Sequence, residues 1–66
     1  MLGTKEFYEL LATFERETIK IVPSATFNKE EKDLWSTGHF YQDATINLLF
    51  TVYMNGYAYG KVMGRD

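Results

Sequence analysis

The sequence predicts a small all-α protein in which a long, a short and a second long helix form a helical hairpin or three-helix bundle. Three patterns favour this fold: an N-terminal stripe of apolar residues, a capping pattern after the single proline, and a long amphipathic stretch in the last third. We expect helices at about residues 4–21, 28–36 and 40–63 of a single domain, 1–66. The two long helices would pack antiparallel, with the short helix closing one end.

The first helix is predicted from apolar residues that recur every three or four positions. Thr4 precedes them as an N-cap, and Pro23 follows them and biases Val22 away from helical geometry. The stripe consists of Phe7, Leu10, Leu11, Phe14, Thr18 and Ile21. Such a helix buries one face and leaves its charged residues in water.

The second helix is predicted from its end signals. Asn28 is expected as the N-cap, and Glu31 completes an approximate capping box three residues later. Gly38 suits the left-handed residue that ends a helix, and Thr37 is a candidate cap for the next one. A single kinked helix over residues 28–63 is the alternative.

The third helix is predicted from polar residues that recur every three or four positions. At about 100° per residue they form one narrow stripe and leave an apolar arc too wide for so small a chain to cover. The stripe consists of Asp43, Asn47, Thr51, Asn55 and Arg65, with the small residue Ala58 among them and Lys61 at the edge. The alternative is an α+β fold with a C-terminal β-hairpin that turns at Asn55-Gly56. The helix is favoured because neither face of that hairpin would be clearly polar.

Length and composition point to association with other protein. A 66-residue domain buries only about 60% of its unfolded surface. It has no cysteine, so no disulfide or thiolate metal site can add stability, and yet 45% of its residues are hydrophobic. We therefore expect a homo-oligomer or a complex with a partner.

Charge and hydropathy argue against nucleic-acid and membrane partners. The net charge is −2 and the basic residues are dispersed, whereas nucleic-acid surfaces cluster them. The uncharged run 44–60 is at the lower length limit for crossing a bilayer, but Asn47, Thr51 and Asn55 interrupt it. The N-terminus has no basic stretch followed by an apolar core, so we expect a cytoplasmic protein.

No pattern in the sequence indicates catalysis, a cofactor or a metal. His39 and Asp43 are four residues apart, but no second His and no Cys complete a ligand set. Ser24 and Ser36 have no nearby base. The acidic residues Glu30, Glu31 and Asp33 are interpreted as a solvated face or as an acidic surface presented to a basic partner.

Aromatic residues and glycines are the candidate contact residues. Gly56 and Gly60 share one side of the last helix, where another backbone can approach closely, and aromatic residues carry much of the energy of protein interfaces. The predicted residues for partner binding or self-association are Trp35, Tyr53, Gly56, Tyr57, Tyr59 and Gly60. Core packing is the alternative role for Trp35 and Tyr53.

The last third also carries the pattern A-T-x-x-L-x-F-x-x-Y-x-x-G-Y-x-x-G, formed by Ala44, Thr45, Leu48, Phe50, Tyr53, Gly56, Tyr57 and Gly60. It resembles the helical tail of small accessory proteins encoded by bacteriophages and prophages, which often reads A-x-x-x-W-x-x-W-x-x-G-Y-x-x-G. Phe and Tyr replace the usual tryptophans. The resemblance implies an inhibitor of a bacterial machine in the host cytoplasm, such as an anti-CRISPR-like protein or a protein that binds another host complex.

The expected function is therefore that of a small, acidic, non-enzymatic protein-binding module. The alternative is a nucleic-acid-binding regulator in which the helices after Pro23 form a helix-turn-helix-like pair around Gly38. Phosphates would then be contacted by Lys29, Lys32, His39 and Lys61.

Overall fold

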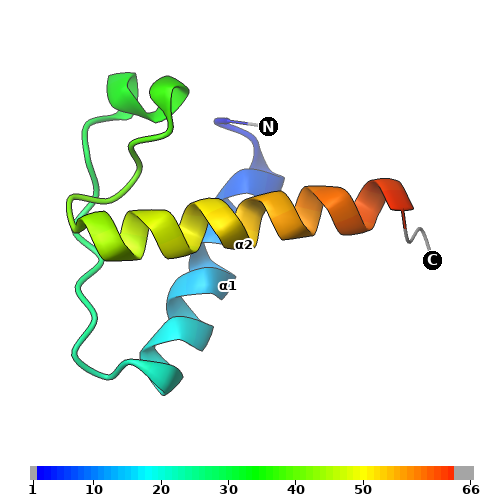
Figure 1. Ribbon diagram of the computed structural model, residues 1–66. Helices are drawn as coiled ribbons and strands as arrows, with labels where there is room; N and C mark the ends of the chain where they lie inside the picture. The colour runs from blue at the N-terminus through cyan, green and yellow to red at the C-terminus, as the bar shows by residue number, and fades with distance from the viewer. Residues whose placement is uncertain (1, 64–66) are drawn as a thin grey trace.

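The computed structural model describes the backbone of residues 2–63 and the side chains of residues 2–60. Within that range the chain forms the α-helix α1 (Lys5–Ile21), the 3₁₀ helix η1 (Lys32–Thr37) and the α-helix α2 (Ala44–Met63). The all-α, long–short–long fold is confirmed (Figure 1). Arg65, predicted for the polar stripe, lies outside the described residues.

Helix α1 forms as predicted. The Thr4 hydroxyl accepts a hydrogen bond from the Phe7 amide at 3.1 Å, which satisfies one of the free donors at the helix start. The helix ends at Ile21, two residues before Pro23. Its buried residues are Phe7, Leu10, Leu11, Phe14 and Thr18, so the predicted stripe faces the core except at Ile21, which is exposed.

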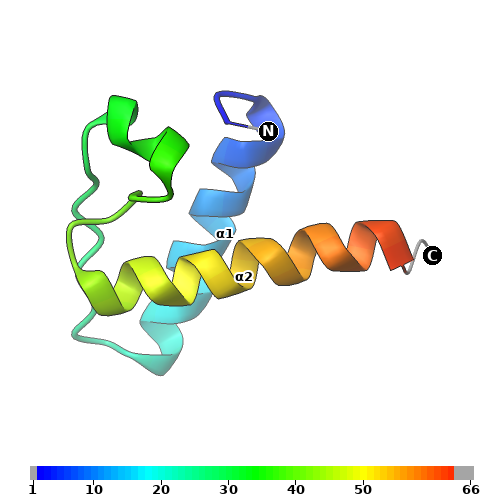
Figure 2. The same cartoon turned by 45° about the horizontal axis from the view of Figure 1, so that its top comes forward.

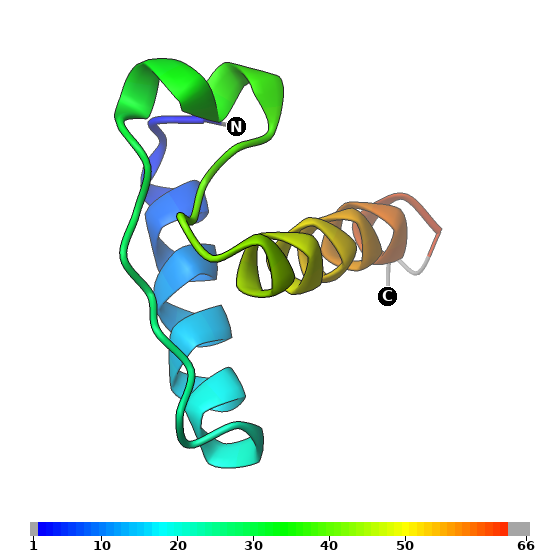
Figure 3. The same cartoon turned by 60° about the vertical axis from the view of Figure 1, so that its left-hand side comes forward.

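The chain then runs back along α1 in extended form and ends in η1 beside the N-terminal half of α1 (Figure 3). Phe27 packs on Phe14, and Trp35 packs on Phe7 with ring centroids 5.6 Å apart. After η1, the loop before α2 makes an antiparallel bridge between Tyr41 and Lys29. These contacts attach the connecting segments to the flank of α1.

The predicted second helix is wrong in extent. Residues 28–31 are not helical, because their backbone bonds with the loop before α2: the Glu30 amide donates to the Phe40 carbonyl and the Gln42 amide donates to the Asn28 carbonyl. Asn28 is therefore not a cap, and the helix that remains is η1. Gly38 does end it, with φ at 88°. The continuous helix over 28–63 is also wrong.

Helix α2 begins at Ala44, with Asp43 rather than Thr37 as its cap; the Asp43 carboxylate accepts a hydrogen bond from the Ile46 amide at 2.9 Å. The helix continues through Asn55 and Gly56, so the hairpin alternative is wrong. It crosses α1 rather than running antiparallel beside it (Figure 1), and its C-terminal half projects past α1 (Figure 2). At the crossing, Phe50 is fully buried and packs on Phe14 and Phe40, with its ring centroid 5.1 Å from each of theirs.

Candidate functional site

The candidate functional site is the exposed apolar side of α2, opposite the residues that α2 buries in the core. At 100° per residue, seven positions of residues 44–60 lie within about 60° of Val52, itself included. Two of them, Thr45 and Asn55, are polar. We call the other five the outer face: Leu48, Leu49, Val52, Gly56 and Tyr59. Leu48, Val52 and Tyr59 are 62%, 63% and 68% exposed, and Leu49 is 41% exposed. A helix in water normally turns polar residues outward, so an exposed apolar face of this kind is unusual and marks a candidate interaction site.

Some residues of the predicted polar stripe point toward the protein rather than toward solvent. The Asn47 side-chain oxygen accepts hydrogen bonds from the amides of Phe40 and Tyr41, at 2.7 and 3.0 Å, and its nitrogen donates to the Gly38 carbonyl at 2.9 Å. Thr51 donates to the Asn47 carbonyl. Both side chains are half-buried. Asn47 of the polar stripe thus bonds with the loop before α2, while the apolar residues of the outer face are exposed.

An apolar groove adjoins the outer face where α2 passes the end of α1. The groove has a volume of about 430 Å³, and its lining is apolar except for Glu17 and Thr18. The apolar lining residues are Phe14, Ile21, Val22, Leu49, Val52 and Tyr53. Ile21 is 80% exposed. The groove extends the apolar surface from α2 onto α1. No local sequence pattern predicts it, because the two segments are far apart in the chain.

Gly56 and Gly60 have no packing role within the described chain. A Cβ atom at either position would have no heavy atom within 4 Å beyond its chain neighbours and the nearby backbone of its own helix. Because glycine disfavours a helix interior by about 1 kcal/mol relative to alanine, these two positions weaken α2 without an intramolecular gain. Both positions are exposed, and their role in partner binding or self-association stays a prediction.

The four aromatic residues predicted for partner contact differ in how far they are buried. Trp35 belongs to the core: its ring is buried and its indole nitrogen donates to the Glu30 carbonyl at 3.1 Å, so its predicted role in partner binding is corrected. Tyr53 is half-buried and packs on Phe14. Tyr57 is partly exposed, and its hydroxyl donates to the Glu6 carboxylate at 2.6 Å. Tyr59 is the most exposed of the four.

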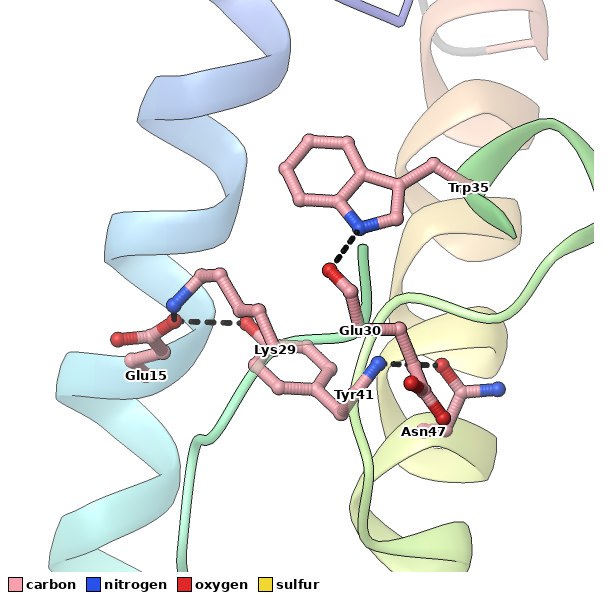
Figure 4. A network of polar contacts seen from close by, with 6 residues as sticks. All are labelled: Glu15, Lys29, Glu30, Trp35, Tyr41 and Asn47. Atoms are coloured by element: carbon pink, nitrogen blue, oxygen red, sulfur yellow. Dashed lines mark hydrogen bonds and ion pairs between the residues drawn. The ribbon is translucent and has the colours of Figure 1, made fainter. Parts of the chain in front are cut away.

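A polar network joins α1, the extended segment and the loop before α2 (Figure 4). The Glu15 carboxylate accepts hydrogen bonds from the Tyr41 hydroxyl at 2.8 Å and from the Lys29 ammonium at 2.5 Å. Burial and the neighbouring Glu15 carboxylate raise the pKa of Tyr41 far above its usual value. Tyr41 therefore stays protonated as a hydrogen-bond donor, which is a structural role and the opposite of an activated base.

The charged residues around η1 form no compact site. Glu31 and Asp33 are exposed and Glu30 is half-buried. Two lysines alternate with them: Lys29 pairs with Glu15, and the Lys32 ammonium lies 5.5 Å from the ring centroid of Tyr8. In residues 2–60 no group of three or more His, Cys, Asp or Glu side chains is placed to hold a metal ion.

His39 and Asp43 do not act together. The His39 ring lies 3.0 Å from the Thr37 hydroxyl, whereas Asp43 caps α2. No helix in the described part of the chain has the length and hydropathy needed to cross a bilayer. Comparison with protein-family models, curated proteins and solved structures yields no match.

Proposed function

We propose that this chain is a non-enzymatic protein-binding module. The observation that carries the proposal is the outer face of α2, where large apolar side chains stand in water on a helix that projects from the core. Isolated exposed apolar residues are common on proteins, but a contiguous apolar surface that continues into a groove is typical of interaction sites.

The chemistry of the remaining residues supports the same proposal. Tyr41, whose pKa departs strongly from its usual value, is held protonated at a structural junction. Its neighbours Glu15 and Lys29 form an ion pair with each other. These three groups therefore have a structural role and consolidate the fold.

The partner we propose is a bacterial protein complex in the cytoplasm, inhibited by this chain in the manner of an anti-CRISPR-like or other anti-defence protein. This part rests on the aromatic–glycine pattern of residues 44–60, which resembles the tails of phage accessory proteins. The acidic residues Glu30, Glu31 and Asp33 would steer the chain toward a basic surface and speed association more than they strengthen it.

A helix-turn-helix role has less support. Lys29 and Lys32, two of the cations it requires, already contact Glu15 and the Tyr8 ring. The segment before α2 is the six-residue η1. An absence of salt-sensitive DNA binding is the expected result.

The proposal is tested by capture from bacterial lysate on immobilised chain. We expect a defined protein complex to bind the wild-type chain and the variant Ala58→Glu, but not Val52→Glu. Ala58 provides the matched control, because it is exposed on the same helix about 120° from Val52. Capture of nothing by the wild-type chain, or equal capture by both variants, contradicts the proposal.

A further inference from the structure

The apolar surface is large enough for a small dimer interface. The outer face and the neighbouring residues Ile21 and Val22 expose six large apolar side chains, at 36–80% of their area. Together they present on the order of 600 Å², compared with roughly 800 Å² per partner in an interface of standard size. The small residues beside them on α2 supply further area.

The spacing of the exposed residues fits a helix as the occupant. Thr45, Leu48, Val52, Asn55 and Tyr59 are all exposed and follow one another at intervals of three, four, three and four residues. This is the period at which two helices stay in contact along a seam. A helix of the length of α2 would be required to cover it.

The helix that best meets these requirements is α2 of another copy. Leu49 and Gly56 lie on the same edge of the outer face, at nearly equal distances on either side of Val52. In an antiparallel pair centred on Val52, Leu49 of each chain meets Gly56 of the other. A large side chain then fills the space over a glycine where, in the described part of the chain, an added Cβ would have no heavy atom within 4 Å beyond its neighbours and its own helix backbone. In a parallel pair, Gly56 would face Gly56 and leave a void.

Charge also permits this pairing. Residues 44–60 carry no charged side chain, so burial of one α2 against another desolvates no ion. The antiparallel arrangement additionally opposes the two helix dipoles.

We propose that this chain forms a symmetric homodimer in which the outer faces of two α2 helices pack antiparallel about Val52, with Ile21 and Val22 at the border. This inference rests on the proposed function, in which the outer face of α2 binds protein. It deepens that function by naming a second copy of this chain as the molecule that covers the outer face. The host complex would then contact the dimer outside the two paired outer faces, and lysate capture would depend on Val52 through dimer formation.

Mass in solution tests the dimer. Sedimentation equilibrium or light scattering is expected to give twice the 7.7 kDa of one chain for the wild type and for Ala58→Glu. Val52→Glu is expected to give 7.7 kDa, because the symmetric dimer brings its two added carboxylates together. Far-UV circular dichroism should show both variants equally helical. A monomeric wild type, or a dimeric Val52→Glu, overturns the proposal.

Cysteine cross-linking tests the orientation, and the chain has no native cysteine to interfere. Val52→Cys is expected to form an intermolecular disulfide and Ala58→Cys is not. Tyr59→Cys should cross-link to Thr45→Cys in a mixture, but not to itself. Self-linked Tyr59→Cys indicates a parallel pair and overturns the proposed geometry.

The two proposals fail separately. A monomeric chain that loses lysate capture on Val52→Glu, but keeps it on Ala58→Glu, supports a binding module and overturns the dimer. A dimer with the expected cross-links that captures nothing supports the dimer and contradicts the proposed function.

Discussion

Replacement of Gly56 by alanine should strengthen the helix and weaken the dimer at the same time. Within one chain, the added methyl group has open space around it. The substitution therefore changes only the helix propensity of this position, and alanine favours α2 by about 1 kcal/mol relative to glycine. Residues 55–60 are all exposed, so this gain should appear as higher far-UV helicity at the end of α2 rather than as a large rise in melting temperature.

In the dimer the same methyl group would meet Leu49 of the second chain. Overpacking at a closely packed site costs about 1–3 kcal/mol, and every 1.4 kcal/mol weakens association about tenfold. The symmetric interface holds two such sites. We therefore expect the dissociation constant of Gly56→Ala to rise at least tenfold in sedimentation equilibrium.

Gly60→Ala is the matched control. Gly60 lies about 80° from Val52, at the border of the outer face, and also has open space within its own chain. It should gain the same helicity with a smaller loss of association. Lower helicity in Gly56→Ala would refute the helix across Asn55-Gly56, and tighter association would refute the close approach at Gly56.

Three further predictions concern the fold. Phe50→Ala removes a fully buried ring and should cost about 3–5 kcal/mol in urea unfolding, most of the stability of so small a domain, whereas Leu48→Ala, measured as a monomer, should cost under about 0.5 kcal/mol. Asn47→Ala removes three hydrogen bonds to the loop before α2 and should cost about 2 kcal/mol; a loss below 0.5 kcal/mol would contradict its bridging role. Tyr41→Phe should cost about 1–2 kcal/mol at pH 7 and should also change the alkaline behaviour. Because burial raises the pKa of folded Tyr41 above its unfolded value near 10, its contribution is complete below pH 10 and falls by up to about 1.4 kcal/mol per pH unit above it. Urea unfolding from pH 8 to 11 should show a steeper loss for the wild type than for Tyr41→Phe, and parallel losses would refute this assignment.

The sequence predicted those parts of the fold that depend on neighbouring residues. Thr4 and Pro23 act within a few residues of the ends of α1, and Gly38 ends η1 by its own backbone freedom. The continuation of α2 through Asn55-Gly56 also followed from the local pattern, because a helix aligns the polar residues and a hairpin scatters them.

The errors arise from contacts between distant residues. Asn28 is a good cap by type, but its carbonyl binds the Gln42 amide, and this long-range bond keeps the segment extended. Asn47 belongs to the polar stripe, and on an amphipathic helix such a stripe normally faces water, yet two amides of the loop before α2 donate hydrogen bonds to its side-chain oxygen. The direction in which α2 turns its apolar arc therefore depends on the loop, which periodicity does not reveal.

The same limit applies to the candidate site. The excess of apolar surface on α2 and the open positions Gly56 and Gly60 could be predicted, because both are properties of one helix. The burial of Trp35 and the groove at Ile21 could not, since each depends on how separate segments meet.

The most direct test of the central claim, that the outer face of α2 binds protein, is the mass of the wild-type chain in solution beside its variants Val52→Glu and Ala58→Glu. We predict a dimer for the wild type and Ala58→Glu, and a folded 7.7 kDa monomer for Val52→Glu. A wild-type chain that stays monomeric up to millimolar concentration, and captures the same proteins with or without the Val52 substitution, would contradict it.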